Sequence, residues 1–139
     1  MELTAIALQT VAENQNILFT ETPVSGNCSI LHREGSGLVT LRGIGAQCRA
    51  RFKIFFSGNI GVPATGTAGA ISVALTLDGE AVASSSMIST PAAVSEFNNV
   101  ASAVYVNVPQ GCCLTVSVRN TSDQAIEVQN ANLIIERVA

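Results

Sequence analysis

Charged side chains are scarce in this sequence. Lys, Arg, Asp and Glu together make up 12% of the 139 residues, about half the share found in an average soluble domain, whereas hydrophobic residues make up 47%. A soluble monomer of this size needs a charged surface to stay dispersed. We therefore expect partner molecules to cover part of the surface. The net charge of −3 argues against nucleic acid as such a partner.

The residue types that perform catalysis or bind metals are also few. His32 is the only histidine, and no Gly-x-Ser-x-Gly or comparable nucleophile motif accompanies it. The acidic residues are scattered singly, apart from Asp78 and Glu80 beside a turn, so no carboxylate pair for acid–base catalysis is evident. The sequence predicts no catalytic residue, no metal site and no cofactor, and hence a protein that is not an enzyme.

Long apolar runs are missing as well. The longest uncharged stretch, residues 54–77, is broken by four glycines and by Pro63, and it lacks the roughly 20 continuous apolar residues of a membrane span. Residues 1–4 do not begin the basic and then apolar pattern of a secretory signal. We expect a protein that is made in the cytoplasm and has no membrane as a partner.

The four cysteines are Cys28, Cys48, Cys112 and Cys113. Because there is no Cys-x-x-Cys pair, a structural zinc site has weak support. Adjacent residues of a strand point to opposite faces, so Cys112 and Cys113 cannot readily bridge each other. A bridge between Cys28 and Cys48 remains open, but small buried thiols are the favoured interpretation.

The basic residues are unevenly placed, since five of the seven fall between residues 33 and 53: Arg33, Arg42, Arg49, Arg51 and Lys53. Two interpretations are open. One is a site for an anion or an acidic partner. The other, which the alternation of residues 49–53 favours, is the solvated face of one strand and its neighbour.

Alternation of apolar and polar residues, the signature of half-buried strands, recurs along the chain. It is clearest in residues 49–56, where the basic residues share one face and the other face carries Ala50, Phe52, Ile54 and Phe56. Further strands are expected at residues 3–8, 16–20, 28–33, 38–42, 71–77, 80–87, 100–108, 112–119 and 125–138. The first two of these are expected to pair with each other, and helix signals are nearly absent.

Turn residues separate these segments. Residues 34–37 and 109–111 are predicted turns, and Asp78-Gly79 predicts a type I′ hairpin because both residues tolerate a positive φ. The apolar parity of the last segment changes between Val128 and Leu133, which predicts a β-bulge near Asn130. Longer connections are expected at residues 58–69 and 89–99.

The faces opposite the core carry small, uncharged residues on three of the expected strands, unlike a typical solvated sheet face. A neighbouring subunit that covers them is the simplest account. The alternative is that they are exposed faces rich in Thr and Ser. The candidate residues of an oligomer interface are Ala74, Thr76, Ala101, Ala103, Tyr105, Thr115 and Ser117.

A family resemblance is found in the order of several short motifs. Leu77-Asp78-Gly79, the loop at Pro91, Val104-Tyr105-Val106, Pro109-Gln110-Gly111 and the closing residues 131–138 follow one another. This order resembles the globular jelly roll of the complement-component and tumour-necrosis-factor superfamily over residues 48–138, and most closely its bacterial branch in spore-surface (exosporium) glycoproteins. The resemblance implies an all-β, antiparallel jelly-roll sandwich of about ten strands, a homotrimer, and a place for Tyr105 in the trimer interface.

The sequence departs from the spore-surface pattern because it contains no Gly-X-Y repeat, and so no collagen stalk. Residues 1–22 are expected to be a strand-like anchoring segment packed on a jelly-roll domain of residues 23–139, with a single domain in all. A stalkless jelly roll is similar to small structural proteins of phages and prophages.

Two functions of different class are therefore expected. The first is a structural protein of a phage or prophage virion (head decoration, head fibre or tail-associated), which binds copies of itself and other virion proteins. The alternative is a binding module at a spore or cell surface, which recognises carbohydrate or protein through its loops. A cupin-like enzyme would need several metal-binding histidines, and only His32 is present.

Overall fold

The computed structural model describes residues 1–45 and 48–139, and strands dominate it. Six strands form sheet A: β1 (Glu2–Ala5), β2 (Gln9–Val11), β3 (Glu21–Val24), β6 (Arg49–Gly61), β10 (Phe97–Pro109) and β12 (Ile126–Arg137). Six form sheet B: β4 (Ile30–His32), β5 (Val39–Arg42), β7 (Ile71–Leu77), β8 (Glu80–Ala81), β9 (Met87–Ser89) and β11 (Cys113–Asn120). A short 3₁₀ helix, η1 (Ala83–Ser85), separates β8 from β9.

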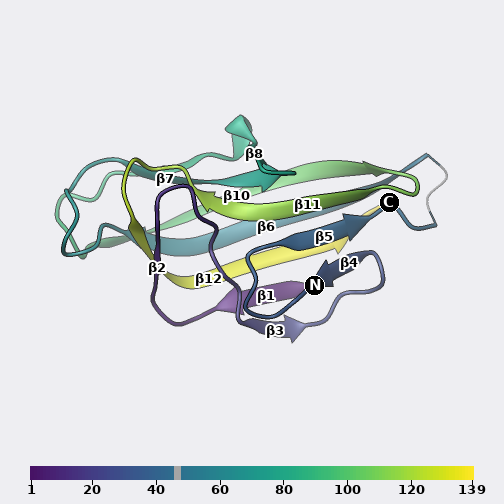
Figure 1. The fold of residues 1–139 in the computed structure, drawn as a ribbon, viewed down its shortest axis with the longest axis horizontal. Helices are drawn as coiled ribbons and strands as arrows, with labels where there is room; N and C mark the ends of the chain where they lie inside the picture. Colours follow the sequence, from purple (N-terminus) through teal and green to yellow (C-terminus); the bar gives the residue numbers. More distant parts are fainter. Residues whose placement is uncertain (46–47) are drawn as a thin grey trace.

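The two sheets are stacked as the layers of a sandwich (Figure 1). Sheet A has the order β10-β6-β12-β1-β3, with β2 also paired to β12. Sheet B has the order β4-β5-β11-β7-β8, with β9 also paired to β7. Every strand pair is antiparallel. The predicted antiparallel jelly-roll sandwich is confirmed.

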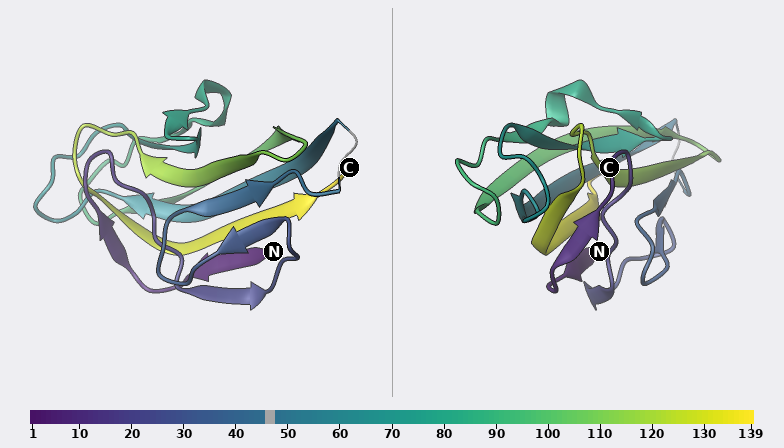
Figure 2. Two further views of the ribbon diagram at one scale, coloured as in Figure 1. Left: turned by 45° about the vertical axis from the view of Figure 1, so that its right-hand side comes forward. Right: turned by 60° about the vertical axis from the view of Figure 1, so that its left-hand side comes forward.

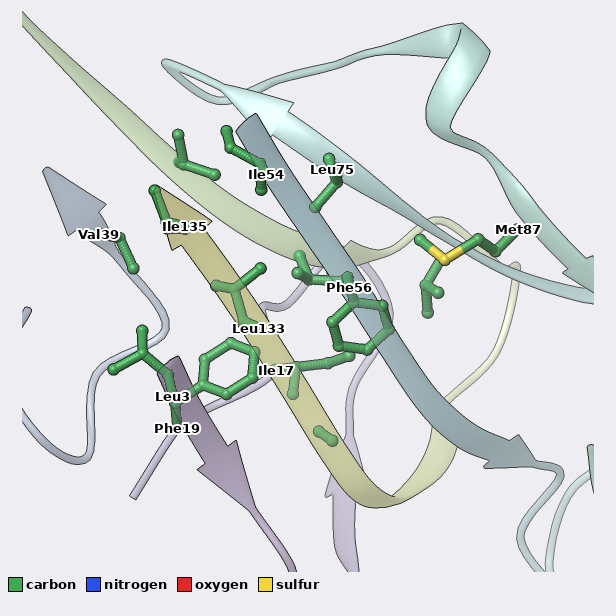
Figure 3. Packing of buried hydrophobic residues seen from close by; sticks show 14 of the residues in the cluster. Leu3, Ile17, Phe19, Val39, Ile54, Phe56, Leu75, Met87, Leu133 and Ile135 are labelled. Atoms are coloured by element: carbon green, nitrogen blue, oxygen red, sulfur yellow. The ribbon is translucent and has the colours of Figure 1, made fainter. Parts of the chain in front are cut away.

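The core lies between the sheets and is built by the alternation that the sequence shows. The four inward residues predicted for residues 49–56 are all fully buried: Ala50, Phe52, Ile54 and Phe56. Figure 3 shows Phe56 and Ile54 from β6 among side chains of both sheets, including Leu133 of β12 and Leu75 of β7. Burying an aromatic or branched aliphatic side chain stabilises a fold by about 1.5–3 kcal/mol.

The predicted turns and bulge are confirmed by the backbone. Asp78 and Gly79 have φ values of 50° and 86°, as a type I′ turn requires. The ladder between β12 and β6 shifts register between Gln129 and Asn132, and Asn130 has a φ of 56°. This bulge restores the inward direction of Leu133, which explains the change of parity.

The expected pairing of residues 3–8 with residues 16–20 is wrong. β1 pairs with β12 and β3 instead, as Figure 2 also shows. Residues 16–20 form no strand; the N–H of Ile17 donates to the carbonyl of Val118 in sheet B at 2.8 Å. Ile17 and Phe19 are fully buried, so their alternation reports burial between the sheets rather than a partner strand.

The expected return strand at residues 80–87 is also wrong. Pairing with β7 stops at Ala81, and β9 resumes it on the other half of β7. In between, the hydroxyl oxygen of Ser85 accepts the N–H of Leu75 at 2.9 Å and donates to the carbonyl of Val82 at 2.7 Å. A serine hydroxyl thus replaces a partner strand, and the chain can leave the ladder.

The two long connections are shorter than expected. β6 continues to Gly61 and β10 begins at Phe97, so residues 58–61 and 97–99 belong to strands. Glycine at position 58 suggested a turn, but it serves close packing. A Cβ atom there would lie 3.1 Å from the ring of Phe56, and the missing side chain makes room for that ring within a regular strand.

Residues 1–22, the expected anchoring segment, contribute β1 and β2 to sheet A. Both strands pair with β12, and the segment supplies five core residues: Leu3, Ala5, Val11, Ile17 and Phe19. The main chain of Met1 exchanges two hydrogen bonds with Ile135, at 2.7 and 2.9 Å.

Candidate assembly surface

The outward face of sheet A carries an exposed aromatic side chain on an uncharged strand. Tyr105 of β10 is 67% exposed, and Ala101 and Ala103 on the same face are exposed as well. β10 has 13 residues and none of them is charged. It forms one edge of sheet A. Natural edge strands are usually short or protected by charge, so this strand has the properties of one that is covered by a partner.

Apolar residues continue across the sheet from β10. In register, Ala103 is opposite Phe55 of β6, and Phe55 is opposite Ile134 of β12. Ile134 is 37% exposed and Phe55 is half-buried. Phe55 and Ile134 were not among the predicted interface residues. The parity of residues 49–56 places Phe55 outward, so the sequence did contain that signal.

Charged residues on this face are sorted by strand. Alternation places the basic ones outward on β6, and we call them the basic strip: Arg49, Arg51 and Lys53. The acidic ones lie outward on β12, β1 and β3, and we call them the acidic strip: Glu2, Glu21, Glu127 and Glu136. Lys53 and Glu136 are opposite each other where the strips meet.

The predicted basic segment therefore does not form one patch. Three of its members make up the basic strip on sheet A, whereas Arg42 belongs to β5 of sheet B and Arg33 to the β4–β5 connection. The Nη1 of Arg42 donates to the carbonyl of Cys28 at 3.5 Å. The alternation of residues 49–53 thus correctly predicts a shared strand face for three of the five residues.

The seven predicted interface residues divide between the two sheets. Ala101, Ala103 and Tyr105 lie on the outward face of sheet A, and the others on sheet B: Ala74, Thr76, Thr115 and Ser117. These faces are on opposite sides of the sandwich, so one flat contact cannot bury both sets.

On sheet B, the chain itself covers most of the predicted residues. Ala74, Thr76 and Ser117 are 0%, 1% and 3% exposed, and the hydroxyls of Thr76 and Ser117 share a hydrogen bond. Arg119 is opposite Ala74 in the ladder, and its Nη2 lies 3.8 Å from where a Cβ of Gly79 would be. Its side chain thus extends along this face, and small residues beneath give it room.

The four cysteines are exposed and free, so the interpretation as buried thiols is wrong. They lie in connections or at a strand start, at the end of the sandwich where Figure 1 shows the β3–β4, β5–β6 and β10–β11 connections. Backbone bonds join these segments: Gln110 N–H donates to Cys48 at 3.1 Å, and Gly43 N–H donates to Cys112 at 3.0 Å. Connections are solvated, which accounts for the exposure.

The single histidine stabilises a turn. Nε2 of His32 donates to the carbonyl of Ser36 at 2.9 Å, four residues along the β4–β5 hairpin. Within residues 1–45 and 48–139, no three His, Cys, Asp or Glu side chains are grouped so that they could hold a metal ion. In the same ranges, no helix has the length and apolar character that crossing a membrane requires.

An open pocket of about 400 Å³ lies between the β6–β7 and β11–β12 connections, and residues 67–70, Asp123 and Gln124 line it. The side-chain amide of Gln124 joins the two connections: it accepts the N–H of Thr67 at 3.0 Å and donates to the carbonyl of Thr67 at 2.8 Å. The pocket is therefore held in shape by a pair of hydrogen bonds.

Comparisons of sequence find nothing similar: no family model and no curated protein matches the chain. Comparisons of structure do. A tumour necrosis factor, Eiger of S. frugiperda, aligns with a TM-score of 0.70 at 12% identity, over 100% of this chain and 92% of that one. The chain has a tumour-necrosis-factor-like jelly-roll fold.

Two further structures share this tumour-necrosis-factor-like fold. The globular domain of zebrafish complement 1qA protein aligns with a TM-score of 0.62 at 11% identity, over 96% of this chain and 93% of that one. Murine APRIL aligns with a TM-score of 0.60 at 8% identity, over 95% and 96%. The fold-level part of the resemblance is thereby confirmed.

Proposed function

We propose that this protein is a non-enzymatic structural component that assembles as a homotrimer through the outward face of sheet A. The observation that carries the proposal is Tyr105, a 67% exposed aromatic side chain on an uncharged edge strand. The apolar surface continues from β10 to Phe55 and Ile134, and contiguous exposed apolar patches mark interaction sites in soluble proteins. The tumour-necrosis-factor-like fold supports a trimer, because neighbours with this fold are typically homotrimers.

Tyr105 is well suited to the centre of such an assembly. On one side along β10 its outward neighbours are the small residues Ala103 and Ala101, so a symmetry-related copy can approach its ring closely from that side. Aromatic rings in a fully covered interface contribute a large share of binding energy. Its cross-strand partner Lys53 provides an aliphatic stem beside the ring.

As the setting of this assembly, we propose a phage or prophage virion, in which the protein is a head decoration, head fibre or tail-associated component bound to other virion proteins. The scarcity of charge over the whole chain supports a protein that works inside a larger particle. The alternative setting is a spore or cell surface.

Native mass spectrometry over a range of dilutions tests the assembly. We expect a trimer that persists on dilution, and a stable monomer would contradict the proposal. Tyr105→Asp should split the trimer while Tyr105→Phe should leave it intact, since the ring is retained. An intact trimer in Tyr105→Asp would remove this residue from the interface.

The biological setting is tested by proteomics of purified particles. We expect to find the chain in virions, and its presence only in spore or envelope fractions would favour the alternative.

A second candidate function is the binding of carbohydrate through loops, and the pocket between residues 67–70 and Gln124 favours it. Its carboxylate and amide groups are of the kind that bind sugar hydroxyls. Glycan-array binding that is lost in Asp123→Ala and retained in Glu34→Ala, a change elsewhere on the surface, would support this function. An array with no bound glycan would contradict it.

A further inference from the structure

The basic and acidic strips cannot neutralise each other fully within one chain. Only Lys53 and Glu136 are cross-strand neighbours. Arg51 on β6 and Glu21 on β3 are separated by β12 and β1, which places their strands about 14 Å apart. That separation exceeds the Debye length of about 8 Å at physiological ionic strength. The face therefore has a positive side and a negative side.

Two of the strip residues use their side chains in hydrogen bonds to uncharged groups. Nε of Arg51 donates to Oδ1 of Asn107 at 3.2 Å, and the carboxylate of Glu2 accepts a hydrogen bond from Nδ2 of Asn132 at 2.8 Å. Both partners are neutral amides. Arg49 and Glu21 are exposed. These four groups are therefore available for contacts with opposite charges from outside the chain.

We infer that the basic strip of one copy binds the acidic strip of the next copy when sheet A assembles. The inference rests on the proposed assembly and adds the charges that orient it. Each copy carries both strips. Opposite charges therefore meet only when the β6 side of one copy's face lies against the β1–β3 side of another copy's face. The reverse orientation brings like charges together and is therefore disfavoured.

The arrangement gives the two parts of the face different roles. The apolar centre around Tyr105 and Phe55 contributes affinity because it removes apolar surface from water. The strips contribute orientation, since opposite charges select one relative placement of the copies. A head-to-tail contact of this kind closes into a ring when the rotation between copies is a simple fraction of a turn.

Charge reversal of each strip tests the inference. Arg49→Glu with Arg51→Glu makes the basic strip acidic, and Glu2→Lys with Glu21→Lys makes the acidic strip basic. The pair Lys53 and Glu136 is left unchanged so that the cross-strand contact within the chain is preserved. Each double variant should raise the dissociation constant of the assembly by about 100-fold or more.

The quadruple variant combines all four changes and exchanges the signs of the two strips. Complementarity between copies is then restored, and we expect assembly to return to within about tenfold of the original affinity. Two matched controls reverse one charge each away from the face, on the side of sheet B: Arg33→Glu and Glu80→Lys. Both residues are exposed, and neither change should alter assembly.

Analytical ultracentrifugation provides the dissociation constants, and far-UV circular dichroism shows whether each variant folds. If a reversal variant fails to fold, the neutral pairs Arg49→Gln with Arg51→Gln and Glu2→Gln with Glu21→Gln replace it, and each should weaken the assembly and its dependence on salt. Double variants that assemble as well as the controls, or a quadruple variant that stays apart, would overturn the inference while the assembly itself stands. A wild-type chain that is monomeric at every concentration would instead refute the proposed assembly, and the inference with it.

Discussion

The ring of Phe19 meets the ring of Phe56 edge-on, with centroids 6.4 Å apart and planes at 76°. Phe56 belongs to β6, whereas Phe19 lies in the segment before β3 that forms no strand. This contact, visible in Figure 3, attaches an irregular N-terminal segment to the centre of the core.

Replacing Phe19 by alanine should therefore destabilise the whole sandwich. The side chain of Phe19 is fully buried, at 0% relative exposure. A Phe→Ala change at such a site costs about 3–5 kcal/mol. Urea denaturation at low protein concentration would measure the loss. Phe19→Leu should cost less, and a Phe19→Ala variant as stable as the original would contradict the packing described.

The hairpin between β7 and β8 provides a second prediction. Gly79 has a φ of 86°, and a side chain in this left-handed region costs about 1–2 kcal/mol. Gly79→Ala should lower the free energy of unfolding by that amount. Gly69 has open space around it and no positive φ, so Gly69→Ala should have little effect. Thermal denaturation of both variants measures the two changes. Equal effects of the two changes would argue against the turn.

The third prediction concerns the thiols. Because all four cysteines are exposed and free, the reduced, folded protein should react with a colourless aromatic disulfide reagent at four sites without denaturant. The Cys28→Ser variant should lose one reactive group. Thiols that become reactive only after denaturation would show that they are buried or bridged.

Arg119 provides the fourth prediction. Its Nε is buried and has no hydrogen-bond partner among the described residues, while its side chain covers small residues of sheet B. Arg119→Met retains apolar cover and removes the unpartnered group, so stability should be unchanged or higher. Arg119→Ala removes the cover and should lower the free energy of unfolding by about 1–2 kcal/mol. A less stable Arg119→Met variant would contradict this view of the side chain.

The sequence predicted the parts of the fold that alternation and turn chemistry specify. Residues 49–56 identified β6 and its buried face, Asp78-Gly79 identified the hairpin, and the parity change identified the bulge at Asn130. Alternation records which residues face the core, but it does not record which strand is the hydrogen-bond partner. For that reason the buried residues Ile17 and Phe19 were assigned to a strand pair that does not exist.

The candidate surface was predictable to a similar extent. Alternation placed Ala103 and Tyr105 outward, and both are exposed. The sequence analysis explained the small outward residues Thr76 and Ser117 in the same way, as residues that a neighbouring subunit covers. Both are buried within the chain itself, where Arg119 of β11 extends along this face towards Gly79. The direction of that side chain depends on tertiary structure that no local pattern specifies.

The uncharged edge of β10 has a consequence for the newly made chain. Its unpaired backbone groups form a template for any extended polypeptide, and neither charge nor proline within residues 97–108 blocks it. Until a sister copy arrives, correct association competes with misdirected strand addition. Soluble yield should therefore depend on how quickly copies meet after synthesis.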